Sequence, residues 1–249
     1  MEAALALANM AVTDGVETVV ATPHLRADHP GVKPRELAGR VAHVQEQLSN
    51  HEIHLRVITG AEVDLLWARE ASKQDLELAS LGQAGRDILL ETPYSTLSSL
   101  FEPMVAEIAG KGYRITLAHP ERNGSFQRRP ERLELLIDSG VLIQLSAGSL
   151  LGRKSSPEQQ LALRLLEGRR AHVLASDAHT TEPWRRPNLS AGFAALAALS
   201  PSLATWMVRD APGAILAGRR LTSPPEVKAT GFRALFRHRR MFEGRKNPT

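Results

Sequence analysis

One repeated pattern limits what this chain can fold into: short apolar runs, each able to form a buried strand, alternate with stretches typical of helices. The centres of these runs lie roughly 25–40 residues apart, the spacing of units in which a helix connects two parallel strands. The six runs are residues 16–21, 54–59, 87–90, 115–118, 141–145 and 171–175. This alternation predicts an α/β protein with a parallel sheet, either open or closed into a barrel.

The segments between the runs carry helix signals. Pro34 suits the first turn of a helix, and Ser155 with Glu158 has the spacing of a capping box. A less regular helical region is expected between residues 62 and 87. The expected helices cover residues 1–13, 34–50, 98–110, 130–139, 155–168, 191–199, 202–208 and 211–217. We expect one domain over residues 1–222 and a basic, flexible tail over residues 223–249.

Side chains that bind metals or move protons follow five of the six apolar runs. Because parallel strands share one direction, their carboxyl ends lie on one face and these side chains can converge. A single histidine in this setting is more often the satisfied end of a core strand. Histidines or carboxylates at the ends of five strands, all in phase, instead favour a metal site. These residues are His24, Glu62, Glu91, His119 with Glu121, and Asp177 with His179.

The candidate ligands are imidazoles and carboxylates, and the chain has no cysteine. This donor set suits Mn²⁺, Fe²⁺ or Zn²⁺ better than Cu(I). There are more ligands than one catalytic ion needs with a position left open for water. The sequence therefore predicts two or more ions bridged by a carboxylate, an arrangement that activates water for phosphoester hydrolysis.

The charge of the chain excludes some functions. The net charge is +4, but the segment from Glu226 onward holds seven Lys or Arg against two Glu, so the rest has a net charge of −1. A nucleic-acid-binding core is therefore disfavoured. The chain lacks cysteine, an apolar run long enough to span a membrane and a basic segment before its first apolar residues. These features together predict a cytoplasmic protein.

Five short segments, taken in order, resemble the PHP superfamily, and more narrowly the bacterial metal-dependent protein-tyrosine phosphatases of capsular and exopolysaccharide synthesis. The resemblance covers nearly all of residues 1–222, and the blocks at His119 and Asp177 are its most specific part. The segments are Thr22-Pro23-His24, Gly60-Ala61-Glu62, Leu90-Glu91, Ala118-His119-Pro120-Glu121-Arg122 and Ser176-Asp177-Ala178-His179.

The resemblance implies a distorted (β/α)7 TIM-like barrel with two or three divalent ions, most often manganese, with zinc, iron or cobalt as alternatives. Arg122 matches an arginine that holds the substrate phosphate, a role suited to a planar and permanently charged group. The implied substrate is phosphotyrosine on a tyrosine autokinase that controls polysaccharide synthesis. The positions that match metal ligands are His24, Glu62, Glu91, His119, Asp177 and His179.

The chain departs from the family in two places. Members begin with a strand that ends in Asp-x-His-x-His, whereas this chain starts at the following helix. Leu25 stands where a second histidine is common. The barrel is therefore expected to lack its first strand, with either a true start upstream or a less active form as the explanation. Two other functions stay open: a small-molecule phosphatase, such as one for histidinol phosphate, and an inactive module that binds phosphotyrosine or a kinase.

Other features carry weaker signals. Arg185 and Arg186 either contact the substrate phosphate or are solvated surface residues. Glu121 either orients a ligand histidine or pairs with Arg122. The segment 232–242 mixes bulky apolar and basic residues, so peripheral contact with a membrane, an acidic partner and a solvated tail are all open. Homo-oligomerisation is open as well.

Overall fold

The structure is a computed structural model that describes residues 1–227. Every strand pair in it is parallel, and the strand order of the larger sheet follows the order along the chain. The strands are β1 (Thr18–Ala21), β2 (His24–Leu25), β3 (Arg56–Thr59), β4 (Glu62–Val63), β5 (Asp87–Glu91), β6 (Arg114–Ala118), β7 (Leu142–Ser146) and β8 (Val173–Ala175). The six expected strands and the mixed α/β class with a mostly parallel sheet are confirmed.

Each of the first two expected strands is followed, after a short break, by a second short strand. β1 and β2 are separated around Pro23, which has no N–H to donate to a ladder. β3 and β4 are separated around Gly60, where a Cβ atom would lie 2.8 Å from Cγ1 of Val20. Backbone hydrogen bonds still cross the breaks, because the N–H of Gly60 donates to Ala21 and that of Glu62 donates to Pro23. The eight segments thus occupy six strand positions.

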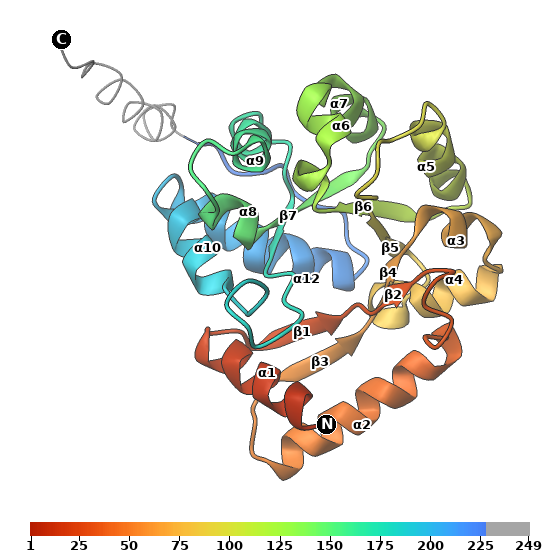
Figure 1. Cartoon of the computed structure of the whole chain (residues 1–249), viewed down its shortest axis with the longest axis vertical. Helices are drawn as coiled ribbons and strands as arrows, with labels where there is room; N and C mark the ends of the chain where they lie inside the picture. The colour runs from red at the N-terminus through yellow and green to blue at the C-terminus, as the bar shows by residue number, and fades with distance from the viewer. Residues whose placement is uncertain (228–249) are drawn as a thin grey trace, which may run out of the picture.

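Helices surround the strands (Figure 1). Three short 3₁₀ turns, η1 (Pro34–Glu36), η2 (Leu81–Gln83) and η3 (Pro120–Arg122), and a π-helical turn, η4 (Trp206–Asp210), complete the described elements. The α-helices are α1 (Glu2–Thr13), α2 (Leu37–Asn50), α3 (Leu65–Glu70), α4 (Lys73–Ala79), α5 (Phe101–Gly110), α6 (Gly124–Arg128), α7 (Pro130–Asp138), α8 (Ala147–Leu151), α9 (Pro157–Glu167), α10 (Leu189–Ala197), α11 (Pro201–Thr205) and α12 (Ala211–Leu216).

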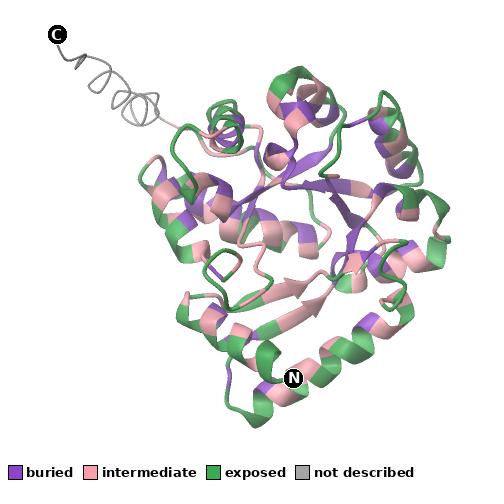
Figure 2. Cartoon of the chain, viewed as in Figure 1, coloured by how far each residue is buried: buried purple, intermediate pink, exposed green. Residues whose placement is uncertain are grey.

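The core lies between the central strands and the helices that cover them. All five residues of β5 are buried, whereas β1 and β3 are only half-buried, as Figure 2 shows. β1, β3, α1 and α2 share a separate small apolar cluster that includes Leu48 and Leu55. The central strands therefore provide a rigid support, and their carboxyl ends carry the candidate ligands.

Several details differ from the expectations. The helix at residue 157 is capped by Ser156, whose Oγ accepts from the N–H of Gln159, rather than by Ser155. The short helices α6 and α8 were not expected, because each has only five residues and no apolar repeat. Within residues 1–227, β8 pairs with β7 and β2 pairs with β4, and no pairing joins β8 to β1 or β2. The barrel therefore stays a prediction.

The expected tail falls largely outside the described residues, which end at residue 227. Its described beginning lies on the body of the protein, because the side chain of Arg169 donates to the carbonyl of Pro224. The segment 232–242 lies outside the described range. Among the helices of the described chain, none combines the length and apolarity needed to cross a bilayer.

Candidate metal centre

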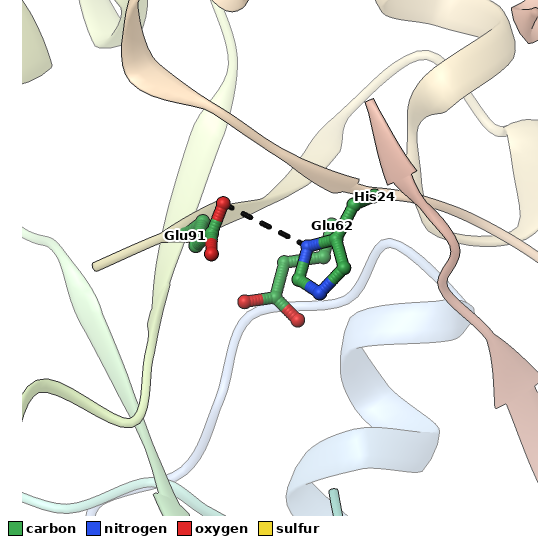
Figure 3. A group of neighbouring side chains, drawn as sticks. All are labelled: His24, Glu62 and Glu91. Carbon is green, nitrogen blue, oxygen red and sulfur yellow. Dashed lines mark ion pairs between the residues drawn. The ribbon is translucent and has the colours of Figure 1, made fainter. Parts of the chain in front are cut away.

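Neighbouring strands bring three of the predicted ligands together. His24 begins β2 and lies opposite Glu62, which begins β4. Glu91 is the last residue of β5, the next strand in the sheet. The Nδ1 atom of His24 lies 3.7 Å from a carboxylate oxygen of Glu91, and Figure 3 shows Glu62 beside this pair. The sheet therefore fixes these three side chains through backbone pairing rather than through a flexible loop.

A second group lies next to the first and shares one residue with it. In each group every residue offers a ligand atom, and these atoms lie within 4.8 Å of one another. The first group is His24, Glu62 and Glu91, and the second is Glu62, His119 and Asp177. Glu62 belongs to both. The two groups are therefore candidates for two adjacent cation sites that share one carboxylate.

The backbone is strained at two members of the second group. His119 has a φ of 35° and Asp177 a φ of 51°, so both adopt the left-handed conformation that non-glycine residues seldom take. Such conformations persist where the surrounding structure imposes them, and they are frequent at functional sites. At His119 the left-handed residue ends the β6 run and starts the η3 turn, which carries Arg122.

Burial makes the cluster electrostatically demanding. Glu62, Glu91 and His119 are each 3% exposed. The pKa of Glu91 is raised overall. Burial raises it most, the charge of His24 opposes this effect, and the charge of Glu62 adds to it. Burial lowers the pKa of His119, but the hydrogen bond to Glu62 and the charges of Glu62 and Asp177 raise it more, so the net shift is upward. Buried carboxylates of this kind need positive charge beside them, from the chain itself or from a bound cation.

Arg122 lies beside the second group and is held from two sides. Its Nη1 donates to Oδ2 of Asp177 at 2.5 Å, and its Nη2 donates to Oγ of Ser146 at 2.7 Å. Arg185 also donates to Oδ2 of Asp177, at 3.3 Å. Two guanidinium groups therefore converge on the carboxylate that borders the candidate cation sites, which is where an anionic substrate would need positive charge.

The remaining predicted site residues lie around the two groups, and Nδ1 of His179 is 3.7 Å from Oδ1 of Asp177. His179 is in neither group, although its ring centroid lies 6.0 Å from that of His24, and Nη2 of Arg185 lies 2.7 Å from its Nδ1. Arg186 is exposed to solvent. Leu25 is fully buried in the main core, so a histidine at this position would not face the cluster without a change in the strand.

The carboxylate of Glu121 makes its hydrogen bonds to two serines, although its charge also acts on Arg122. Its carboxylate accepts hydrogen bonds from the N–H of Ser146 at 3.0 Å and from Oγ of Ser149 at 2.6 Å, and it is fully buried. Burial raises the pKa of Glu121, against the hydrogen bonds from these two serines. Glu121 thus ties the η3 turn to the end of β7 and orients no ligand histidine directly.

Three further residues at the site were missed by the sequence analysis. Ser146 ends β7, the one strand without a predicted ligand, and its polar side chain at a strand end was the available signal. Arg26 follows β2, and its Nη1 donates to both carboxylate oxygens of Glu91, at 3.0 and 3.1 Å. Tyr94 follows β5, and its ring lies 6.2 Å from that of His119. Nothing in the local sequence around Arg26 and Tyr94 distinguishes them from surface residues.

The residues present fit divalent ions. Buried carboxylates and histidines converge from several strands, and both His24 and His119 have a buried Nδ1 atom without a hydrogen-bond partner among the described residues. An unpaired buried ring nitrogen is costly unless it binds something. Oxygen and imidazole donors without sulfur suit Mn²⁺, Zn²⁺ or Fe²⁺. Cation binding with phosphate recognition by arginine is the chemistry that this arrangement can support.

These features define the class: an α/β protein with a parallel sheet and a candidate metal centre at the ends of its strands. Residues 1–216 match the family described as "Capsular polysaccharide synthesis, CpsB/CapC". The chain belongs to this family, and the resemblance inferred from the five sequence segments is confirmed.

Individual relatives agree with this assignment. The chain is 30% identical over 176 residues to the tyrosine-protein phosphatase YwqE of Bacillus subtilis. This aligned region covers 71% of this chain and 69% of the relative. It is 26% identical to the putative tyrosine-protein phosphatase CapC of Staphylococcus aureus, over 71% and 69% of the two chains. A solved structure from work on YwqE and on CpsB of Streptococcus pneumoniae, described as metal-dependent tyrosine phosphatases, matches with a TM-score of 0.74 and 26% identity. That match covers 90% of both chains.

Proposed function

We propose that this chain is a metal-dependent tyrosine phosphatase that hydrolyses phosphotyrosine on a protein of capsular or exopolysaccharide synthesis. The single observation that carries the proposal is the pair of ligand groups that share Glu62, with Arg122 held at Asp177 beside them. The relatives YwqE and CpsB, described as metal-dependent tyrosine phosphatases, support the same reaction.

The two groups would each hold one divalent ion, with Glu62 between them, and manganese is the ion that we propose. We assign His24 and Glu91 to one ion and His119 and Asp177 to the other. His179 completes the set if its ring turns away from Arg185. When bound, such ions supply activated water and neutralise charge on phosphoryl oxygens.

The chain's own residues bind and orient the phosphoryl group. Arg122 is fixed by Asp177 and Ser146, so it meets an incoming phosphate without first losing conformational freedom. Arg185 lies on the other side of Asp177 and would add a second contact, while Arg186 would reach the rest of the substrate. Hydrolysis joins the water oxygen to phosphorus and breaks the bond to the tyrosine oxygen. The phenol that leaves has a pKa of about 10 and departs more readily than an alkyl alcohol.

The substrate that we propose is a phosphotyrosine-bearing protein, with a tyrosine autokinase as the partner. The relatives' names support a protein phosphotyrosine rather than a small metabolite such as histidinol phosphate. We also propose that the sheet is of the barrel type. Its strand order follows the chain without reversal, as in α/β barrels, whereas doubly wound sheets reverse direction at a switch point.

The test is hydrolysis of a phosphotyrosine peptide and of histidinol phosphate by the full chain supplied with Mn²⁺. We expect the peptide to be the better substrate, EDTA to abolish its hydrolysis and Mn²⁺ to restore it. Arg122→Ala should lower kcat/KM by about 100-fold, as expected for the loss of a group that stabilises charge in the transition state. Arg209→Ala, a change at an exposed arginine on η4, is the matched control. Hydrolysis that resists chelation would overturn the proposal.

A further inference from the structure

Tyr94 is an exposed aromatic side chain beside the buried metal centre. It is 64% exposed, whereas His119 is 3% exposed. The centroids of the two rings lie 6.2 Å apart and their planes differ by 19°. This distance is within the range of offset-stacked aromatic pairs. Tyr94 thus stacks beside a candidate ligand ring and leaves most of its own surface exposed to solvent.

The backbone that carries Tyr94 is held in place by the segment that carries the site. The Nδ2 atom of Asn123 donates to the carbonyls of both residues that flank Tyr94. One residue further back, Oγ1 of Thr92 donates to the carbonyl of Ala118 at 2.6 Å, and Thr92 is buried. Ala118 and Asn123 lie on either side of the turn that contains Arg122. The position of Tyr94 is therefore fixed relative to the phosphate-binding arginine.

Tyr94 is also electrostatically close to Arg122. Burial lowers the pKa of Arg122, whereas the charge and hydrogen bond of Asp177 and the charge of Glu121 raise it, and an ionised Tyr94 would lie close enough to raise it as well. Tyr94 is absent from the three apolar clusters of the described chain, so its ring is not required to fill the core. A fixed backbone with an exposed ring beside a phosphate site is a surface suited to a ligand.

We propose that Tyr94 is a specificity-determining residue that packs against the aromatic ring of the substrate, so that the site prefers aryl phosphates to alkyl phosphates. This inference rests on the proposed phosphatase function and names the part of the substrate that the site reads. In an aryl phosphate the ring is attached directly to the ester oxygen, so anchoring the phosphate at Arg122 brings that ring close to Tyr94. In phosphoserine the same space holds a methylene group and then the peptide backbone, which offer no aromatic face.

The experiment compares the binding of two peptides of one sequence by fluorescence anisotropy. One carries a non-hydrolysable phosphonate analogue of phosphotyrosine and the other a phosphonate analogue of phosphoserine, each measured in buffer with Mn²⁺. Because the phosphonate group is common to both, contributions from Arg122 and from metal ions cancel in the ratio of the two dissociation constants. We expect the wild type to bind the aryl peptide about tenfold more tightly than the alkyl peptide.

The variants separate ring recognition from a purely structural role. Tyr94→Ala should lose most of the aryl preference while its affinity for the alkyl peptide stays unchanged. Tyr94→Phe should keep the preference. Leu135→Ala, which truncates an exposed apolar side chain on α7, should also keep it. Equal binding of the two peptides by the wild type, no binding of either, or an equal loss for both in Tyr94→Ala would overturn the inference.

Failure of the inference about Tyr94 can be told apart from failure of the proposed phosphatase function. A wild type that shows a Tyr94-dependent aryl preference but hydrolyses no phosphotyrosine would retain this inference and remove the phosphatase activity. An active phosphatase whose aryl preference survives Tyr94→Ala would retain the phosphatase function and overturn the inference about Tyr94.

Discussion

His119 and Glu62 form a buried pair in which Nε2 of the histidine lies 3.0 Å from a carboxylate oxygen. We expect this pair to couple a proton to metal binding. Burial alone lowers the pKa of His119, but Glu62 and Asp177 raise it overall, so the metal-free histidine keeps its proton at a higher pH than an ordinary one. A metal ligand must be unprotonated, so metal binding at this group has to release that proton.

The first prediction is that metal affinity depends on pH. Below the raised pKa of His119, each fall of one pH unit should weaken Mn²⁺ binding by about tenfold, because one proton is displaced per ion bound at this group. The measurement is calorimetric titration at pH 6 and pH 8 in buffers of different ionisation enthalpy, which reports the protons released. An affinity that is the same at both values, with no proton release, would contradict the coupling.

The sequence located the strands and most of the candidate ligands for a physical reason. Buried parallel strands are nearly continuous apolar runs, so the transition from an apolar run to His24, Glu62, Glu91 or His119 is visible in the sequence alone. That these residues occupy neighbouring strands follows from the alternation with helices.

The residues that the sequence analysis missed reach the site through tertiary contacts, which the local sequence does not encode. Arg26 and Tyr94 lie on loops, and their relation to Glu91 and His119 appears only when separate strands are brought together. Whether an arginine near the site pairs with a ligand or stays in solvent depends on side-chain rotamers. The sharing of Glu62 by two groups likewise follows from distances of a few ångströms.

The second prediction concerns the support of Arg122 by Ser146. Ser146→Ala removes the acceptor for Nη2 of Arg122, a charge-assisted hydrogen bond of 2.7 Å. We expect KM for a phosphotyrosine peptide to rise by about tenfold with metal content unchanged, since such a bond contributes roughly 1.5–3 kcal/mol. Steady-state kinetics with elemental analysis measure this. Ser149→Ala is the control, because Ser149 contacts Glu121 instead. Equal effects of the two changes would show that Ser146 acts only through packing.

The third prediction concerns Arg26, whose positive charge lies against Glu91. Arg26→Ala should strengthen Mn²⁺ binding by about fivefold, because removing one partly exposed positive charge near a divalent ion removes about 1 kcal/mol of repulsion. Arg26→Lys keeps the charge and should change affinity less. Isothermal titration compares the three proteins. Weaker binding in Arg26→Ala would mean that Arg26 supports the site by organising Glu91.

The fourth prediction concerns stability and lies away from the site. The Nδ1 atom of His172 accepts a hydrogen bond from the N–H of Ile143 at 3.0 Å, which requires that nitrogen to be unprotonated. Burial, with the charge of Arg170, lowers the pKa of His172 to about 4. A folded pKa below the unfolded value of about 6.5 means that the unfolded state binds the proton first, so stability is lost as pH falls from 7 toward 4.

The size of this effect is about 2 kcal/mol between pH 7 and pH 5. Urea denaturation at several pH values measures it. His172→Asn keeps an acceptor for the N–H of Ile143 but does not titrate, so its stability should change less over the same range. Identical pH profiles of wild type and variant would show that His172 does not carry the dependence.

The most direct test of the shared centre is the metal stoichiometry of single variants, measured by elemental analysis after saturation with Mn²⁺ and removal of free ion. The wild type should hold two ions per chain. Glu91→Ala and Asp177→Ala should each hold one, because each residue belongs to one ligand group. Glu62→Ala should hold fewer than either, because Glu62 belongs to both groups. A Glu62→Ala protein that keeps both ions, or that loses no more than Glu91→Ala, would contradict a centre built around Glu62.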